Sequence, residues 1–175
     1  MNTLYDIERL ATELINTTFT FKANGITQVM NCGEQGQYKF KFDQAKRRLG
    51  CCKYTKKLIT LSKPLCIENL DKVYGKLTDT ILHEIAHALS YQLYGSEGRG
   101  HGSKWRSIAK QIGCDGKRCY SHNDVKSVKA KYTLTCPTCE IESPRHRKPK
   151  YAYACGKCCN GSYNVKHEFV VKQNY

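Results

Sequence analysis

The sequence predicts one domain of mixed helices and strands over residues 1–125, followed by a smaller zinc-ribbon module over residues 131–172. The first domain is predicted because apolar residues recur at helical spacing in some segments and alternate with polar residues in others. The module is predicted by two C-x2-C pairs, "CPTC" and "CGKC", in the last quarter of the chain. A chain of 175 residues is long enough for one real core and one small satellite module.

The first half of the domain begins with a helix and continues with strands. Apolar side chains at helical spacing predict an amphipathic helix over residues 4–15. Residues 25–31 and 37–43 are strand-like, the second because Tyr and Phe alternate with Lys. The segment "RRLGCCKYTKKLITLS", residues 47–62, predicts a hairpin.

The second half of the domain is mainly helical. A helical region is predicted for residues 64–94, with an interruption near Gly75 and a stop at Gly95. A glycine-rich loop follows, and then a short helix with Ser103 as its N-cap and Gly113 as its stop. Residues 114–130 are polar and irregular, and from about residue 131 we expect short strands around the paired cysteines.

Composition excludes several classes of protein. No run of about 18 apolar residues exists, so we expect no membrane span and no membrane partner. The start, "MNTLYDIERLATELI", has early acidic residues and no basic region before an apolar stretch, so we expect no secretion signal. Without export, the 11 cysteines predict metal ligands and buried thiols rather than a disulfide framework.

Positive charge is concentrated in the second half of the chain. Residues 1–98 hold 13 Lys and Arg against 10 Asp and Glu, a net charge of +3, whereas residues 99–175 hold 16 against 5, a net charge of +11. A basic half of this kind indicates a polyanionic partner, usually nucleic acid. A merely solubilising surface is the alternative.

The predicted helix "TDTILHEIAHALSYQLYG" carries two histidines and a glutamate at the centre of an apolar run. Its apolar residues cover most of the circumference, and burying His83, Glu84 and His87 without partners would cost roughly 2 kcal/mol or more per group. His83 and His87 are four residues apart, so both project from one face within reach of a single ion. Glu84 can accept a proton from the water that zinc acidifies. The pattern is typical of a zinc-dependent peptide hydrolase; buried histidines with other partners are the alternative.

A catalytic zinc usually has a third protein ligand and one open position. The metzincin continuation is excluded, because Ser90 and Leu93 stand where that class has a glycine and a histidine. His101, in "RGHGSKW", is the best candidate, since the glycines on both sides let the backbone fold the ring back over the first helix. A loop histidine by itself is normally only solvated.

The motif "LHEIAHAL", followed 14 residues after its second histidine by "HGSKW", resembles the SprT-like family, which includes the Spartan DNA-dependent proteases. The upstream segment "RRLGCCKYTKKLITLS" is similar to that family's hairpin, with its R-x-G-x-C/Y pattern and its I-x-L-S end. The resemblance covers roughly residues 4–115, with a zinc ribbon after it as in bacterial members. It implies a small α+β, zincin-like fold of helices packed on a short antiparallel sheet, and an exposed groove. It also implies His83, His87 and His101 as zinc ligands and Glu84 as the catalytic base.

The two cysteine pairs predict a structural zinc site. Cys136, Cys139, Cys155 and Cys158 form C-x2-C, fifteen residues and C-x2-C, a spacing that allows four thiolates to close a tetrahedral site. Cys159 is the alternative to Cys158, which the two-residue gap favours. A redox-active pair is disfavoured by the lack of a thioredoxin-like context.

The segment between the pairs is basic and aromatic. Its cations can neutralise phosphates, and its tyrosines can stack on unpaired bases. A solvated loop whose tyrosines pack the small core of the module is the alternative. The predicted nucleic-acid residues are Arg145, Arg147, Lys148, Lys150, Tyr151 and Tyr153.

The remaining cysteines are predicted to be buried thiols. These are Cys32, Cys51, Cys52 and Cys66, which lie in strand or apolar contexts. Cys114, Cys119 and His122 form a third group whose spacing matches no metal site, so thiols and a solvated histidine are preferred. Trp105 is expected to brace the active site with its apolar helix face.

The residues and the resemblance together predict a cytoplasmic, monomeric zinc metalloendopeptidase, at the nucleoid or, in a eukaryote, in the nucleus. It would bind DNA and act on DNA-bound or DNA-crosslinked proteins, with one catalytic and one structural Zn²⁺. The alternatives are a nucleic-acid-binding zinc-ribbon protein with a vestigial or differently used H-E-x-x-H site, and a small-peptide or amide hydrolase. The intact Glu84 favours an enzyme. Tyr91, Arg106 and Tyr120 are alternatives for the group that stabilises the oxyanion.

Overall fold

The computed structural model describes residues 2–118 and 125–175 of the chain. The chain divides into two compact units, Met1–Ser127 and Val128–Tyr175. None of the helices in the two described ranges combines the length and the apolar character that a membrane span requires.

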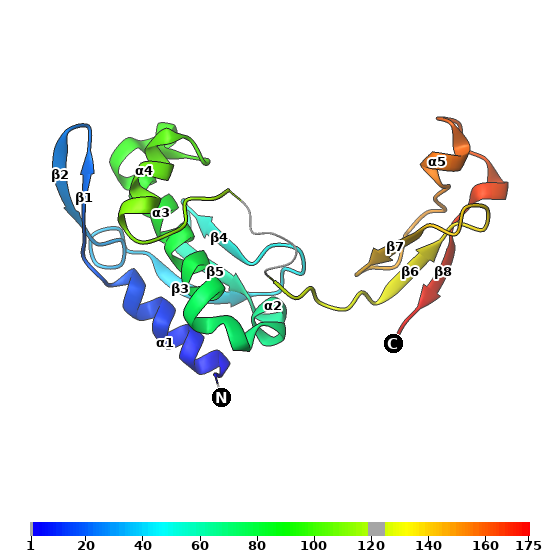
Figure 1. Cartoon of the computed structure of the whole chain (residues 1–175), viewed down its shortest axis with the longest axis horizontal. Helices are drawn as coiled ribbons and strands as arrows, with labels where there is room; N and C mark the ends of the chain where they lie inside the picture. The colour runs from blue at the N-terminus through cyan, green and yellow to red at the C-terminus, as the bar shows by residue number, and fades with distance from the viewer. Residues whose placement is uncertain (1, 119–124) are drawn as a thin grey trace. The chain divides into compact units, whose positions relative to one another are not determined.

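The first unit contains helices and short strands in mixed order, which confirms the predicted α+β class (Figure 1). Its elements are α1 (Leu4–Ile15), β1 (Phe19–Ala23), β2 (Ile26–Met30), β3 (Lys39–Asp43), β4 (Gly50–Lys53), β5 (Leu58–Ser62), α2 (Lys63–Glu68), the 3-10 turn Leu70–Lys72, the π-helical turn Val73–Leu77, α3 (Thr78–Tyr94), the 3-10 turn Gly95–Gly98 and α4 (Ser103–Gln111).

Helix α1 spans the residues that the apolar periodicity predicts, and a capping box precedes it. The Thr3 hydroxyl accepts the Asp6 N–H at 3.2 Å, and the Asp6 carboxylate accepts the Thr3 N–H at 2.8 Å, so the two residues form a capping box. The helix buries Ile7, Ala11 and Ile15 along one face.

The three-stranded sheet differs in one respect from the predicted antiparallel arrangement. Its order is β3-β5-β4, with β5 antiparallel to β4 but parallel to β3. Residues 44–49 connect β3 to β4 and leave room for one strand between the two. The turn after β4 then reverses the chain, and β5 occupies that place. Strand β5 therefore runs in the direction of β3. As the central strand, it buries Ile59 and Leu61 completely.

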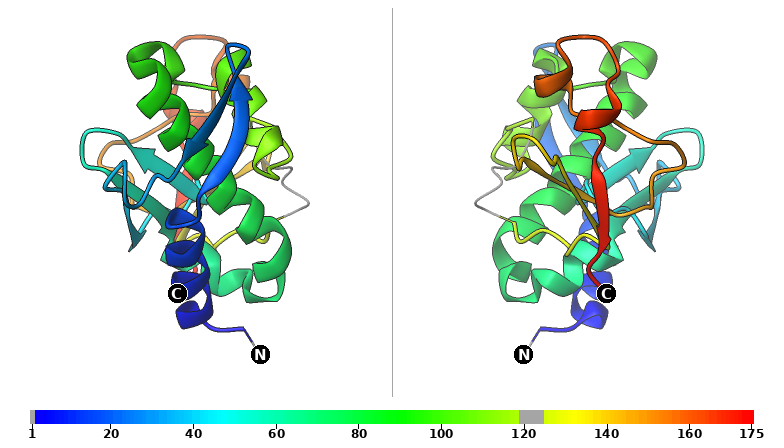
Figure 2. Two further views of the ribbon diagram at one scale, coloured as in Figure 1. Left: turned by 90° about the vertical axis from the view of Figure 1, so that its left-hand side faces the viewer. Right: turned by 90° about the vertical axis from the view of Figure 1, so that its right-hand side faces the viewer.

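A second hairpin contains a strand that the sequence analysis did not predict. Strand β1 pairs with β2 through a turn at Asn24 and Gly25, both with positive φ (52° and 76°), as a tight hairpin turn requires. Gln111 of α4 accepts the Lys22 N–H at 2.7 Å and donates to the Lys22 carbonyl at 2.9 Å. The hairpin accordingly stands beside α4 in both figures (Figures 1 and 2).

Helix α3 is the core of this unit and contacts α1, α4, β4 and β5 (Figures 1 and 2). The predicted interruption near Gly75 is the π-helical turn before α3, and Gly95 ends α3 with φ of 57°. Gly102, rather than Ser103, is the N-cap of α4, because its carbonyl already accepts the Arg106 N–H at 3.0 Å. Ser103 is thus the first helical residue.

The second unit is a three-stranded antiparallel sheet with two turns at one end. Its elements are β6 (Tyr132–Thr135), β7 (Glu142–Arg145), α5 (Gly156–Cys159), the 3-10 turn Val165–His167 and β8 (Val170–Gln173), in the strand order β7-β6-β8. The buried apolar residues of this unit are Leu134, Cys136 and Cys155. A core this small is rarely stable by itself, and a bound metal ion is one of the usual means of stabilising it.

Candidate active site and metal centres

Helix α3 presents the predicted H-E-x-x-H residues. Glu84 and His87 are each only 6% exposed, and His83 is half-buried. Spacing of four residues places the imidazoles of His83 and His87 on one helix face, with ring centroids 5.0 Å apart. The apolar residues Ile81, Ile85 and Leu89 are completely buried, which anchors this helix at the centre of its unit.

His101 reaches the two histidines from the loop before α4. Its Nε2 atom lies 2.9 Å from His83 Nε2 and 3.1 Å from His87 Nε2. Gly100 precedes it with φ of 76°, a conformation that side chains disfavour, so this loop depends on a glycine there. The structure therefore brings together the three histidines that the sequence analysis predicted as ligands.

The electrostatics of the cluster suit a metal ion. Burial, together with the neighbouring His101, lowers the pKa of His83 to about 4, and burial with His83 and His101 lowers that of His87 to about 3. Burial and the nearby Arg118 and Arg106 also lower the pKa of His101. All three imidazoles are neutral at pH 7, which is the form that binds a metal. Three converging neutral nitrogen donors fit Zn²⁺.

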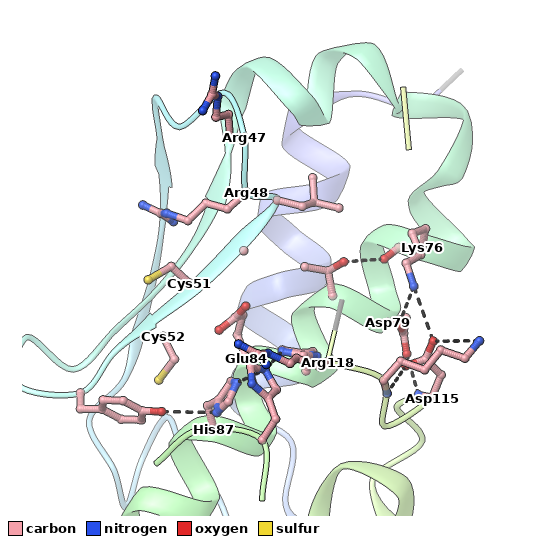
Figure 3. A pocket seen from close by; sticks show the side chains of 18 residues that line it. Arg47, Arg48, Cys51, Cys52, Lys76, Asp79, Glu84, His87, Asp115 and Arg118 are labelled. Atoms are coloured by element: carbon pink, nitrogen blue, oxygen red, sulfur yellow. Dashed lines mark hydrogen bonds and ion pairs between the residues drawn. The ribbon is translucent and has the colours of Figure 1, made fainter. Parts of the chain in front are cut away.

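Two aromatic side chains orient the histidine rings. Trp105 is 1% exposed, packs at 24° to the His87 ring with centroids 5.1 Å apart, and donates from Nε1 to the His83 carbonyl at 3.4 Å. This confirms that Trp105 braces the site. The Tyr54 hydroxyl lies 3.3 Å from His87 Nδ1 (Figure 3). A ligand bound through Nε2 carries its proton on Nδ1, so the Tyr54 oxygen accepts it.

Glu84 is held between α3 and strand β4. Burial raises the pKa of its carboxyl to about 8, while the Cys52 N–H and the charge of Arg48 act in the opposite direction. Burial thus makes the Glu84 carboxylate a stronger base than an exposed carboxylate, which suits a group that must accept a proton from water. The strand approaches closely because Gly50 has no side chain: a Cβ there would lie 2.7 Å from Glu84 Oε1.

The histidines and Glu84 share one pocket, with a cavity volume of about 550 Å³ (Figure 3). One wall comes from residues 47–54, and the other from the start of α3 and residues 115–118. Cys51 and Cys52 were predicted as core thiols but are partly exposed and line this pocket, because β4 is an edge strand. Cys32 and Cys66 are buried as predicted.

Gly50, Tyr54 and the Cys52 N–H were given no role in the sequence analysis. Their positions follow from strand pairing and from the packing of the sheet on α3, which local patterns do not specify. The signal that points toward them is the R-x-G-x-C/Y pattern of the hairpin.

Four cysteines of the second unit form a separate cluster. Cys136 Sγ lies 3.9 Å from Cys158 Sγ, and Cys139 Sγ lies 3.7 Å from Cys155 Sγ. All four sulfur atoms are within 4.8 Å of one another, with Cys158 rather than Cys159 as the fourth member. Burial would raise the pKa of Cys136, but the N–H groups of Cys139 and Thr138 lower it to about 7. Four thiols with one already partly ionised fit a closed zinc site.

The six predicted nucleic-acid residues lie on the surface of the second unit. All six side chains are exposed, Tyr151 by 76% and Tyr153 by 54%, so the tyrosines do not fill the small core. Arg145 ends strand β7, and the other five follow it in the long connection to α5.

The third group of sequence candidates is not assembled in the described residues. Cys119, His122 and Tyr120 lie outside them. Cys114 is buried beside Asp79 and Asp115, and these two carboxylates also hold the ammonium group of Lys76. Tyr91 packs against Tyr54 with ring centroids 4.6 Å apart and the ring planes tilted by 36°.

Comparison with known proteins agrees with these features. The chain is 26% identical to Protein SprT of Pseudomonas entomophila over 147 residues, which cover 75% of this chain and 88% of that protein. It is 33% identical over 88 residues to Protein SprT of Vibrio parahaemolyticus, covering 47% of this chain and 53% of the relative. The chain thus spans about half the length of that relative and of Protein SprT from Pseudomonas putida strain W619, to which it is 28% identical. No solved structure matches.

The family model of the SprT-like family matches residues 12–127, which include β4, the whole of α3 and His101. The matched region contains both walls of the pocket and all three histidines. The chain therefore belongs to the SprT-like family.

Proposed function

We propose that this protein is a zinc-dependent metalloendopeptidase. The observation that carries the proposal is the convergence of three neutral imidazoles on one point, with the buried Glu84 carboxyl in the same pocket. His83, His87 and His101 would hold Zn²⁺, which acidifies water and polarises a carbonyl group.

The residues of this chain supply the rest of the chemistry. Glu84, next in sequence to His83, would accept the proton of the attacking water and return it to the leaving amine. The Cys52 N–H and the bare backbone of Gly50 hold that carboxyl in place. Tyr54 would hold the His87 ring through Nδ1, and Trp105 packs against the rings of His83 and His87.

We propose a second, structural Zn²⁺ in the Cys136, Cys139, Cys155 and Cys158 cluster. A closed set of four thiolates leaves no open position for chemistry. Its role would be to fold the second unit, whose apolar core is too small to do so unaided.

We further propose that the protein cleaves DNA-bound or DNA-crosslinked proteins, at the nucleoid or, in a eukaryote, in the nucleus. The support is the net charge of +11 on residues 99–175 and the exposure of the basic and aromatic residues between the two cysteine pairs. Basic side chains would contact phosphates, and exposed tyrosines would stack on unpaired bases.

The test is cleavage of a DNA-binding protein by the zinc-loaded enzyme, with and without DNA. Glu84→Gln keeps the size of the side chain but removes the base, so cleavage should fall by about 100-fold or more while zinc content is retained. Glu97→Gln, an exposed carboxylate paired with Lys104, is the matched control. Cleavage by Glu84→Gln at the wild-type rate would show that Glu84 is not the base. DNA-independent cleavage would contradict only the DNA part of the proposal.

A further inference from the structure

The pocket that contains Glu84 and the histidines also contains a marked excess of positive charge. Its basic lining residues are Arg47, Arg48, Lys76, Lys117 and Arg118. Against them the lining offers Asp79 and Asp115, besides the buried Glu84. Charge at an active site affects which substrates bind, so the partner of each cation indicates whether its charge is available to a substrate.

Two of the cations, Lys76 and Lys117, are engaged by carboxylates of the protein on one side of the pocket. Lys76 Nζ lies 3.2 Å from Asp79 and 3.5 Å from Asp115, and Lys117 Nζ lies 3.9 Å from the same Asp115 oxygen. In Figure 3 these contacts form a compact cluster on one side of the pocket. These groups hold one another in place and leave little net charge there.

On the opposite side, Arg48 Nη2 is paired with Asp43 at 2.8 Å. Asp43 is itself held by Thr60 and by the Ala45 N–H, so this guanidinium is part of the sheet edge. Figure 3 shows Arg48 and Arg47 away from the histidines, on the far rim.

Arg118 is different. Within residues 2–118 and 125–175 it forms no ion pair with an Asp or Glu, and it lines the same pocket as Glu84 and the three histidines (Figure 3). Its charge acts on His101, whose pKa it helps to lower. Arg118 is exposed, and an anion that binds between this guanidinium and a divalent cation in the pocket would offset the repulsion between the two positive charges.

On the basis of the proposed peptidase function, we propose that Arg118 binds the carboxylate of an Asp or Glu side chain in the substrate, and so makes the enzyme select acidic residues next to the scissile bond. A planar guanidinium fork matches a carboxylate through two parallel N–H···O bonds. The neighbouring cations cannot substitute for it, because Lys76, Lys117 and Arg48 already hold carboxylates of the protein.

The test uses the zinc-loaded full chain and peptides with an acetylated N-terminus and an amidated C-terminus, so that only a side chain supplies the carboxylate. Each peptide exists as a Glu and a Gln version, with the substitution placed in turn at three positions on each side of the scissile bond. At one position, kcat/KM should favour Glu over Gln by about ten- to a hundredfold, the scale of one charge-assisted hydrogen-bonded pair.

Arg118→Gln should reduce this Glu-to-Gln ratio to near one. Arg118→Glu should make a third version of the peptide, with Lys at the same position, a better substrate than the Glu version. Lys117→Gln removes the same charge one residue away and should keep the ratio. If Arg118→Gln keeps the ratio, or lowers kcat/KM for the Glu and Gln peptides by the same factor, the proposal is wrong. The second result would assign Arg118 to the oxyanion instead.

A binding measurement separates this inference from the peptidase proposal. Fluorescence anisotropy with the Glu84→Gln protein should give tighter binding of the Glu peptide by about tenfold, and Arg118→Gln in that background should abolish the difference. Discrimination in binding without any cleavage by the wild type would contradict the peptidase function but support carboxylate recognition. Equal binding of both peptides, together with equal cleavage, would overturn the inference.

Discussion

Gly50 and Glu84 lie so close together that a side chain on Gly50 would occupy the position of the Glu84 carboxylate, with a Cβ–Oε1 distance of 2.7 Å and a Cβ–Cγ distance of 2.9 Å. The strand edge and the helix are therefore matched to each other at the proposed catalytic base. The methyl group of Thr80 lies equally near, at 2.8 Å. A carboxyl displaced from this contact would have to move toward the cavity that Glu84 lines.

We predict that Gly50→Ala impairs catalysis without removing zinc. The added methyl group would displace the Glu84 carboxyl, and a displacement of about 1 Å at a reacting group can cost roughly 100-fold. We therefore expect kcat to fall by about 10- to 100-fold, with zinc content unchanged. Gly75→Ala is the control, since a Cβ there meets no atom within 4 Å. Wild-type kcat in Gly50→Ala would show that the contact has no bearing on the reaction.

We predict two zinc ions per chain in chemically different sites. Elemental analysis of the purified protein should find about two, one for the histidine cluster and one for the cysteine cluster. His87→Ala should lose one ion and keep the other, while Cys139→Ser should lose the other and unfold residues 128–175. A stoichiometry near one that His87→Ala leaves unchanged would contradict the two-site arrangement.

Tyr54→Phe should weaken the histidine site. The substitution keeps the ring that packs against Tyr91 but removes the oxygen beside His87 Nδ1. Loss of such a partner typically costs about 10- to 100-fold in metal affinity or activity, and we expect the lower end because the hydroxyl is uncharged. Competition with a chelator measures the Kd for zinc. Tyr94→Phe, whose hydroxyl contacts Asn24 at the far end of α3, should leave that Kd unchanged.

DNA affinity should depend on salt mainly through the basic loop of the second unit. Replacing Arg145, Arg147, Lys148 and Lys150 with Gln should reduce the slope of log K against log salt by up to about 3 to 4, if each residue meets a phosphate. A matched variant removes the same charge from Lys39, Lys41, Lys56 and Lys57 of the first unit. If that variant flattens the slope and the loop variant does not, DNA binds the first unit.

The exposed tyrosines should contribute more to the binding of single-stranded DNA than to the binding of duplex DNA. Tyr151→Ala and Tyr153→Ala should weaken binding of a single strand by about 1 to 3 kcal/mol per stacked base, and weaken duplex binding less. Titration of labelled single-stranded and duplex oligonucleotides measures both. Tyr163→Phe, which removes a hydroxyl bonded to Glu168 but keeps the exposed ring, is the control. Equal losses for the two forms of DNA would argue against stacking.

The sequence by itself determined the features that depend on local spacing. Helical periodicity predicted α1 and α3, a four-residue interval placed His83 and His87 on one face, and the C-x2-C pairs predicted the cysteine cluster with Cys158 in it. The geometry of a single helix is sufficient for the two histidines, and each C-x2-C pair needs only a single turn to place its two thiols together. The basic second half was likewise readable from composition.

Only the tertiary structure decided the features that depend on contacts between distant segments. The parallel pairing of β3 with β5, the strand β1 held by Gln111, and the approach of Gly50 and Tyr54 to α3 all join residues about 20 to 90 positions apart. The same holds for Arg118, whose ion-pairing state depends on which cations of the pocket Asp79, Asp115 and Asp43 neutralise. Periodicity reports which face of an element is buried, but the partner on that face is selected by the packing of the whole unit.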